Sequence, residues 1–190
     1  MHWASSPIIE TMSRLANDIL PHDLARLTVE TFIREGAVIE PPLDPLGVLA
    51  MRAGAFVTLR LMNGQLRGCI GTIDADRSNV AQEIVQNAIS AATRDPRFPP
   101  VSNRELPSLT YGVDVLSIPE PVRGPEDLDP AVYGVIVETL DWRRRGLLLP
   151  RIDGVASAEA QWRAVHAKAG IKPGTPVRVE RFTVTRFGED

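Results

Sequence analysis

The only cysteine of the chain, Cys69, stands between two glycines and follows an arginine by two residues. It lies in the segment Leu66-Arg67-Gly68-Cys69-Ile70-Gly71-Thr72. A strand gains nothing from glycine, so Gly68 and Gly71 indicate that some group approaches the backbone closely there. A thiol beside a cation is a candidate nucleophile, because the cation favours the reactive thiolate. This segment is therefore the candidate site.

A β-hairpin is expected to position the segment. Residues Gly54–Leu61 are rich in β-branched, aromatic and aliphatic side chains, which favour a strand. The dipeptide Asn63-Gly64 is typical of a two-residue type I′ turn, so Gln65–Thr72 should return antiparallel to the first strand.

Pairing through such a turn predicts which side chains share a face. It sets Leu61 opposite Leu66, Leu59 opposite Gly68 and Val57 opposite Ile70, which gathers the aliphatic residues on one face. The other face then carries Phe56, Thr58, Arg60, Arg67, Cys69 and Gly71. Two interpretations of the cysteine stay open, a small core residue or a group directed away from the core.

The same pairing places Arg60 opposite Arg67, and like charges facing each other across strands repel. Either both side chains spread into solvent, or an anion or carboxylate lies between them. In the second case the two arginines would make this face a surface that recognises anions. A three-residue turn would shift the register and remove the inference.

Length and composition limit the classes of protein. The chain has 190 residues and a formal net charge of −3, which fits one domain over residues 1–190 and makes nucleic acid an unlikely partner. Neither a secretory leader nor a membrane-spanning run is visible, so we expect a cytoplasmic location. The histidines are scattered, and we predict no metal site and no cofactor.

The remaining elements indicate an α+β fold with a mainly antiparallel sheet and flanking helices. Hydrophobic periodicity predicts helices over residues 7–20, 23–34, 80–93 and 158–169, and further strands over residues 109–116, 132–137, 146–149 and 177–185.

Two connecting segments also carry candidate functional residues. Asp95, Arg97 and Phe98 form either a structural corner, in which Arg97 holds Asp95, or part of a recognition surface. Residues 141–145 place Trp142 before three arginines, which suggests a solvated turn or a turn that closes over an anion or stacks on a base.

Several of these segments, taken in order, resemble the AMMECR domain family. They are Leu66–Thr72, the run Asp95-Pro96-Arg97-Phe98-Pro99-Pro100, Glu105-Leu106-Pro107 and Arg144-Arg145-Gly146-Leu147-Leu148-Leu149-Pro150. The resemblance implies two closely packed subdomains with the cysteine segment near the cleft between them, and no established reaction. It also implies Memo-like and radical SAM proteins as associated partners. Where many relatives carry His-Gly, this chain has Tyr133-Gly134, which weakens a Cys/His catalytic pair.

We therefore expect a binding module of unknown function whose cleft recognises a small anionic ligand or a partner protein. The alternative is a cysteine-centred enzyme or carrier with Cys69 as nucleophile. A third hypothesis is RNA binding, which the net negative charge of the chain disfavours. The candidate ligand-binding residues are Arg60, Arg67, Gly68, Gly71, Thr72, Arg97, Phe98, Tyr133 and Arg145.

Overall fold

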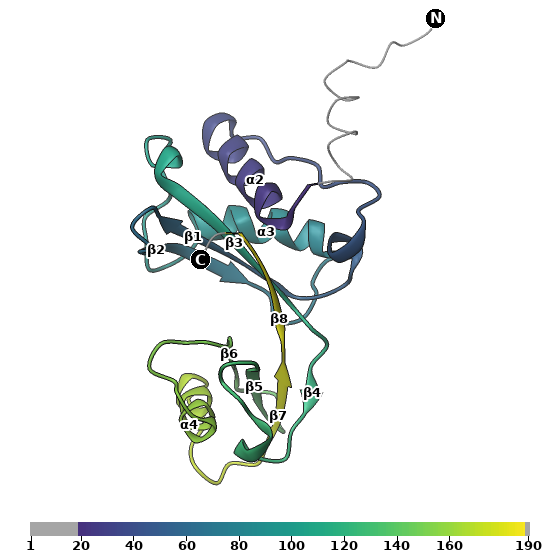
Figure 1. Ribbon diagram of the computed structural model, residues 1–190, viewed down its shortest axis with the longest axis vertical. Coiled ribbons are helices and arrows are strands. Elements are labelled where there is room, and N and C mark those ends of the chain that lie inside the picture. Colours follow the sequence, from purple (N-terminus) through teal and green to yellow (C-terminus); the bar gives the residue numbers. More distant parts are fainter. Residues whose placement is uncertain (1–18, 189–190) are drawn as a thin grey trace, which may run out of the picture. The chain divides into compact units, whose positions relative to one another are not determined.

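The computed structural model describes residues 19–188, which form two compact units (Figure 1). The first unit comprises the chain up to Val115 and, in addition, the C-terminal segment that begins at Arg186. The second unit comprises Leu116–Thr185. The helix expected over residues 7–20 lies almost wholly outside the described residues.

The first unit packs two helices on one face of a four-stranded sheet of order β2-β1-β3-β8 (Figure 1). β1 pairs antiparallel with both β2 and β3. Its elements are α2 (Pro21–Glu35), β1 (Ala55–Leu61), β2 (Leu66–Gly71), α3 (Val80–Thr93), β3 (Leu109–Leu116) and β8 (Val184–Gly188), with short 3₁₀ helices at Gly47–Ala50 and Leu106–Ser108.

Local sequence signals explain where the two helices begin and end. Pro21 occupies the first turn of α2, and Gly36 ends the helix with a φ of 68°, a conformation that glycine adopts without a steric penalty. The side chain of Asn79 accepts a hydrogen bond from the backbone N–H of Gln82 at 3.0 Å and so caps α3. The predicted helices over 23–34 and 80–93 are confirmed.

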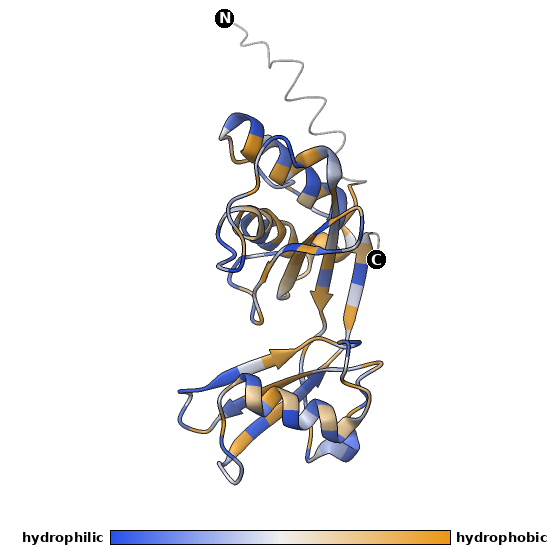
Figure 2. Ribbon diagram, turned by 90° about the vertical axis from the view of Figure 1, so that its left-hand side faces the viewer, coloured by the Kyte–Doolittle hydropathy of each residue, from blue (hydrophilic) through white to orange (hydrophobic). Residues whose placement is uncertain are grey.

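The core of the first unit lies between the helices and the inner face of the sheet. Val57 and Leu59 of β1 have no exposed surface and pack against buried residues of α3 such as Ile84 and Ala88. Figure 2 shows polar and apolar residues in alternation along α2, as expected for a helix that covers a core with one side.

The second unit contains a sheet of order β4-β7-β5-β6, and α4 contacts β5 and β6. Its core is built around Val135, Val137, Val165 and Val179. The elements are β4 (Glu120–Pro121), a 3₁₀ turn at Pro125–Asp127, β5 (Gly134–Thr139), β6 (Arg145–Leu148), α4 (Ala158–Lys168) and β7 (Val177–Phe182).

The α+β class is confirmed, with antiparallel pairing in two sheets where one was expected. The single strand predicted over residues 177–185 is wrong. It is divided at Thr183 into β7, which pairs with β5, and β8, which lies beside β3 in the other sheet. In the described residues no helix has the length and apolar character needed to cross a membrane.

Candidate functional site

The β1–β2 hairpin closes with a three-residue turn, Met62 to Gly64. The N–H of Leu61 donates to the carbonyl of Gln65, and Gly64 alone in this turn has a positive φ, of 82°. A two-residue type I′ turn needs two such residues, so that prediction is wrong. Arg67 is the extra residue of a β-bulge that restores the expected pairs Leu59 with Gly68 and Val57 with Ile70.

The bulge changes the surroundings of the two arginines. Arg60 lies opposite Leu66, so the predicted pairing of Arg60 with Arg67 is wrong. The exposed Arg60 side chain donates to the carbonyl of Gly64 at 3.0 Å. Arg67 is 8% exposed, and its Nε donates to Glu105 Oε1 at 2.7 Å. A carboxylate of the chain itself therefore balances the guanidinium of Arg67.

Glu105 is held in its ionised form. Its side chain accepts hydrogen bonds from Arg67 and from the backbone N–H and hydroxyl of Ser102. The Arg67 contact, which has the largest effect, and the two bonds from Ser102 together lower the pKa of Glu105 to about 2. This ion pair fixes the bulged segment to the loop that precedes β3.

Asp95 forms the centre of a second cluster on the hairpin. Arg97 donates to both oxygens of the Asp95 carboxylate, from Nε at 2.9 Å and from Nη2 at 2.7 Å. The backbone N–H of Cys69 donates to the same carboxylate at 2.8 Å, and Arg97 Nη2 donates to the Cys69 carbonyl at 3.3 Å. These contacts confirm the prediction that Arg97 holds Asp95 in a structural corner.

These contacts control the ionisation of Asp95. The hydrogen bonds from Arg97 have the largest effect and hold the pKa of Asp95 well below its ordinary value, with a further contribution from the Cys69 N–H. Phe98 lies between the two arginines, with its ring centroid 5.6 Å from the Arg97 guanidinium and 5.9 Å from that of Arg67. The two ion pairs and the aromatic ring thus form one connected cluster.

Cys69 lies on the sheet face opposite the core, which is the second of the two interpretations that the sequence left open. Its side chain is half-buried, and the hydroxyl of Thr58 donates to Cys69 Sγ at 3.4 Å. We call this face, which the register defines, the outer face. Its half-exposed members are Phe56, Thr58, Leu66, Cys69, Gly71, Thr110 and Gly112.

The close approach indicated by the two glycines is present, and the approaching groups belong to the chain itself. A Cβ added at Gly68 would collide with the backbone carbonyl of Ala91 in α3. A Cβ added at Gly71 would collide with the ring of Phe56, its cross-strand partner. Both glycines are therefore explained by packing within the first unit.

Thr72 belongs to a buried polar network at the start of α3. Its hydroxyl donates to Glu83 Oε2 at 2.8 Å, and the other oxygen of Glu83 accepts the backbone N–H of Arg77 at 2.6 Å. Asn87 also donates to the carbonyl of Ala55 at 3.0 Å. Sequence reasoning missed this network, because Glu83 and Asn87 read as polar positions of an amphipathic helix.

The other two candidate residues lie in the second unit. Tyr133 packs its ring under Arg181, whose guanidinium is 4.3 Å from the ring centroid, and its carbonyl accepts a hydrogen bond from Gln161. Arg145 forms an ion pair with Glu138, with Nε 3.8 Å from Oε1. Arg178 covers one face of the exposed Trp142 ring at 4.7 Å.

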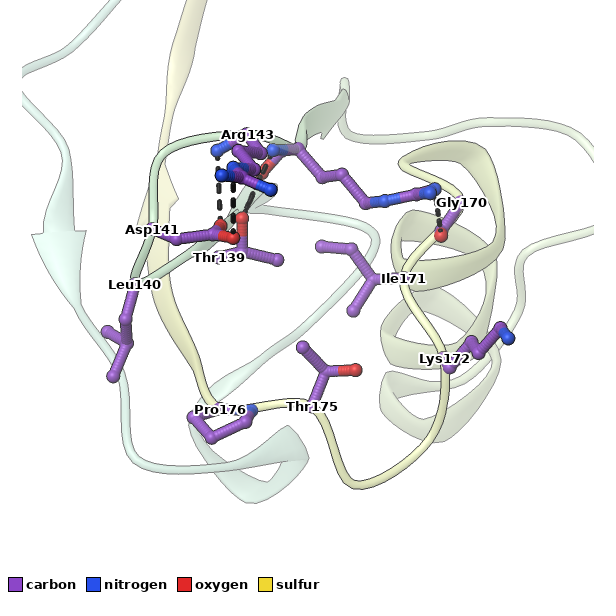
Figure 3. A pocket seen from close by; sticks show the side chains of 10 residues that line it. Thr139, Leu140, Asp141, Arg143, Gly170, Ile171, Lys172, Thr175 and Pro176 are labelled. Atoms are coloured by element: carbon purple, nitrogen blue, oxygen red, sulfur yellow. Dashed lines mark hydrogen bonds and ion pairs between the residues drawn. The ribbon is translucent and has the colours of Figure 1, made fainter.

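The second unit also holds a pocket of about 830 Å³ that sequence reasoning missed (Figure 3). The turn between β5 and β6 forms one side of the pocket, and the loop between α4 and β7 forms the other. The sequence signal was the run of arginines at residues 143–145, but nothing local indicated which distant segment would face it.

These features define a class of protein, an α+β chain with two sheets and a half-buried cysteine on an open sheet face. A family model described as AMMECR1 matches residues 22–189. A protein of Thermotoga maritima is 53% identical over 161 residues, which cover 84% of this chain and 91% of that protein. The chain belongs to the AMMECR1 family.

Two further relatives extend the comparison. A protein of Clostridium acetobutylicum is 41% identical over 168 residues, which cover 87% of this chain but 35% of that longer protein. The crystal structure of an uncharacterized protein from Pyrococcus horikoshii matches with a TM-score of 0.80 and 32% identity, and the match covers 90% of each chain.

Proposed function

We propose that the chain is a non-catalytic binding module that recognises a partner protein through the outer face of the first unit. The observation that carries this proposal is the composition of that face. It lies opposite the helices, and its half-exposed centre around Cys69 and Thr58 consists of small or apolar side chains, with Arg60 and Asp114 toward its ends. Such a surface favours contact with another protein surface.

The charge balance of the face favours a protein over a small anion. Arg67 is paired with Glu105, Arg97 with Asp95, and Arg186 with Asp114 at 2.7 Å. Each of these three cations has a carboxylate of the chain within ion-pair distance, so an anionic ligand would have to compete with that carboxylate. The exposed Arg60, at the edge of the face, donates to the carbonyl of Gly64. A protein partner gains from the Phe98 ring and the outer face without displacing these ion pairs.

The neighbours of Cys69 favour binding over catalysis. Nucleophilic catalysis by a thiol needs an adjacent base that accepts its proton. Thr58, Asp95 and Arg97 hydrogen-bond to Cys69 through its thiol, its N–H and its carbonyl, respectively. Asp95 accepts four hydrogen bonds and has a lowered pKa, so it is a poor proton acceptor. Threonine and arginine are not bases at neutral pH.

One observation favours the second candidate function, a cysteine-centred enzyme or carrier. The thiol is half-exposed and accepts a hydrogen bond from the Thr58 hydroxyl, a contact that would also stabilise a thiolate. Under this alternative, Cys69 would form a covalent adduct with a substrate or with the partner. Cys69→Ser would then abolish the activity.

The decisive experiment measures binding of purified Memo-like and radical SAM proteins, the partners that family resemblance implies, by isothermal titration calorimetry. Gly112→Arg adds a long side chain to the outer face, where a new Cβ would meet nothing nearer than 3.9 Å. Leu43→Arg adds the same side chain at a loop position that is 95% exposed. We expect Gly112→Arg to weaken binding at least about tenfold, roughly 1.4 kcal/mol, and Leu43→Arg to leave it unchanged.

Cys69→Ser separates the two candidate functions. A binding module should retain its affinity within about twofold, because this change alters one atom of a broad surface. Intact-mass measurement of the wild-type complex should show no adduct on Cys69. Equal binding by Gly112→Arg and Leu43→Arg, or no binding of either partner, would contradict the proposal.

A further inference from the structure

The pocket of the second unit is lined by residues that do not belong to the outer face, and the proposed function does not use it. Its volume of about 830 Å³ lies within the range of about 300–1,000 Å³ that small-molecule sites occupy. Figure 3 shows Ile171 and Thr175 pointing from the α4–β7 loop toward the β5–β6 turn, where Thr139 and Asp141 lie opposite them.

Cations outnumber carboxylates among the lining residues. Arg143, Arg144 and Lys172 contribute positive charge, and Asp141 contributes the one carboxylate. The formal charge of the whole chain is −3, so this pocket departs in sign from the rest of the molecule. A concave site of one sign concentrates ligands of the opposite charge.

Arg144 is held by a neutral acceptor, so its positive charge is not balanced by a carboxylate of the described residues. Its Nη1 donates to the carbonyl of Gly170, a neutral acceptor at the end of α4. Gly170 has a φ of 64°, and a Cβ there would lie 2.6 Å from Arg144 Nη1, so the absence of a side chain leaves room for the guanidinium. The described residues place no carboxylate within ion-pair distance of Arg144, and its remaining N–H groups can serve a ligand.

Arg143 adds a second cation that can move toward a ligand. Its Nε lies 3.6 Å from Asp141 Oδ2, and its side chain is 84% exposed, so this ion pair contributes little to stability. Lys172 stands on the opposite loop with its side chain directed away from the centre of the pocket (Figure 3). Ile171 is 6% exposed and provides an apolar wall, beside Pro176.

We propose that this pocket binds a small organic oxyanion, with a phosphate or carboxylate group against Arg143 and Arg144 and an apolar body against Ile171 and Pro176. Thr175 lines the same pocket from the α4–β7 loop (Figure 3). The proposal concerns the second unit alone and does not depend on the function proposed for the outer face.

The test titrates the full chain with phenyl phosphate, benzoate and inorganic phosphate, each at constant ionic strength maintained with sodium chloride. Backbone amide shifts in two-dimensional NMR spectra report where each probe binds. We expect saturable shifts confined to residues 139–144 and 170–175, with phenyl phosphate bound more tightly than inorganic phosphate. Binding of phenyl phosphate alone assigns a phosphate group, and binding of benzoate alone assigns a carboxylate.

Two charge reversals of equal size provide the matched control. Arg143 and Arg123 are 84% and 88% exposed, each is paired with an aspartate, and only Arg143 lines the pocket. Arg143→Glu should weaken binding about tenfold, because it removes the attraction between the guanidinium and the anion and adds a repulsion between two negative charges. Each effect has the magnitude of a surface ion pair. Arg123→Glu should change the affinity by less than about twofold.

Arg144→Lys provides a second variant that keeps the positive charge at the pocket and removes the planar fork that reaches Gly170. It should weaken phenyl phosphate binding about fivefold. The proposal is overturned if no probe gives saturable shifts in the pocket, or if Arg123→Glu weakens binding as much as Arg143→Glu does.

Discussion

Gly68→Ala tests the close packing of β2 against α3. The new Cβ would collide with the backbone carbonyl of Ala91 and lie 3.2 Å from its carbonyl carbon. Both atoms belong to the backbone of a buried helix that cannot swing aside as a flexible side chain does. Overpacking typically costs about 1–3 kcal/mol, and we expect the upper end, about 3 kcal/mol. For a chain of this length that lowers the melting temperature by roughly 6–12 °C.

Gly112→Ala is the matched control in the same sheet. Its Cβ would meet nothing nearer than the carbonyl of Phe187 at 3.9 Å, an ordinary contact. The free energy of unfolding should stay the same or rise by up to about 1 kcal/mol, because alanine restricts the unfolded chain.

Residue-resolved hydrogen exchange is the appropriate assay for this pair of variants. Trp142 and Trp162, the tryptophans of the described residues, both lie in the second unit. Tryptophan fluorescence would therefore report unfolding of the second unit, whereas both substitutions lie in the first. Amides of β2 and α3 should lose protection in Gly68→Ala and keep it in Gly112→Ala. Equal protection in the two variants would refute the packing explanation of Gly68.

Three further predictions concern stability. Contacts from Arg67, the largest, and from Ser102 lower the pKa of Glu105 to about 2 from an ordinary value of 4.5, so their stabilisation is complete above pH 4.5 and is lost as pH falls toward 2. In urea denaturation, the stability of Glu105→Gln should decline less steeply over that window than that of the wild type, and an identical decline would argue against the ionised Glu105. Asn79→Ala should destabilise the chain by about 1 kcal/mol through loss of the α3 cap, measured by urea denaturation, whereas the exposed Ser78→Ala should have little effect. Gly134→Ala should cost about 2 kcal/mol, since its Cβ would collide with the buried Phe182 ring; an unchanged melting temperature would contradict that contact.

The sequence predicted most of the secondary structure because the signals are local. The bounds of α3 and β3 match the predictions, since an N-cap with an apolar stripe marks the helix and strict alternation marks the strand. Alternation offered the position of Cys69 opposite the core as one of two interpretations, and the pairing of β1 with β2 decided between them. Segments 177–182 and 184–188 read as one strand because both alternate in the same way, and only their pairing partners separate them.

Details of the candidate site were less predictable. A single positive φ at Gly64, in place of two, moves the closing pair of the hairpin by one residue and creates the bulge at Arg67. That change replaces the expected Arg60–Arg67 repulsion with an ion pair to Glu105. The turn types differ little in backbone free energy, and this difference is small compared with the free energy gained when the hairpin packs against the rest of the unit.

The sequence by itself determined the family and the α+β class, because these depend on motifs and on periodicities within short segments. The tertiary structure alone decided which charges neutralise each other and where a pocket forms. Arg67 meets Glu105 across 38 positions, and the turn at residues 139–144 meets the loop at residues 170–176. Contacts between segments so far apart depend on how whole elements pack together, which no local pattern of residues specifies.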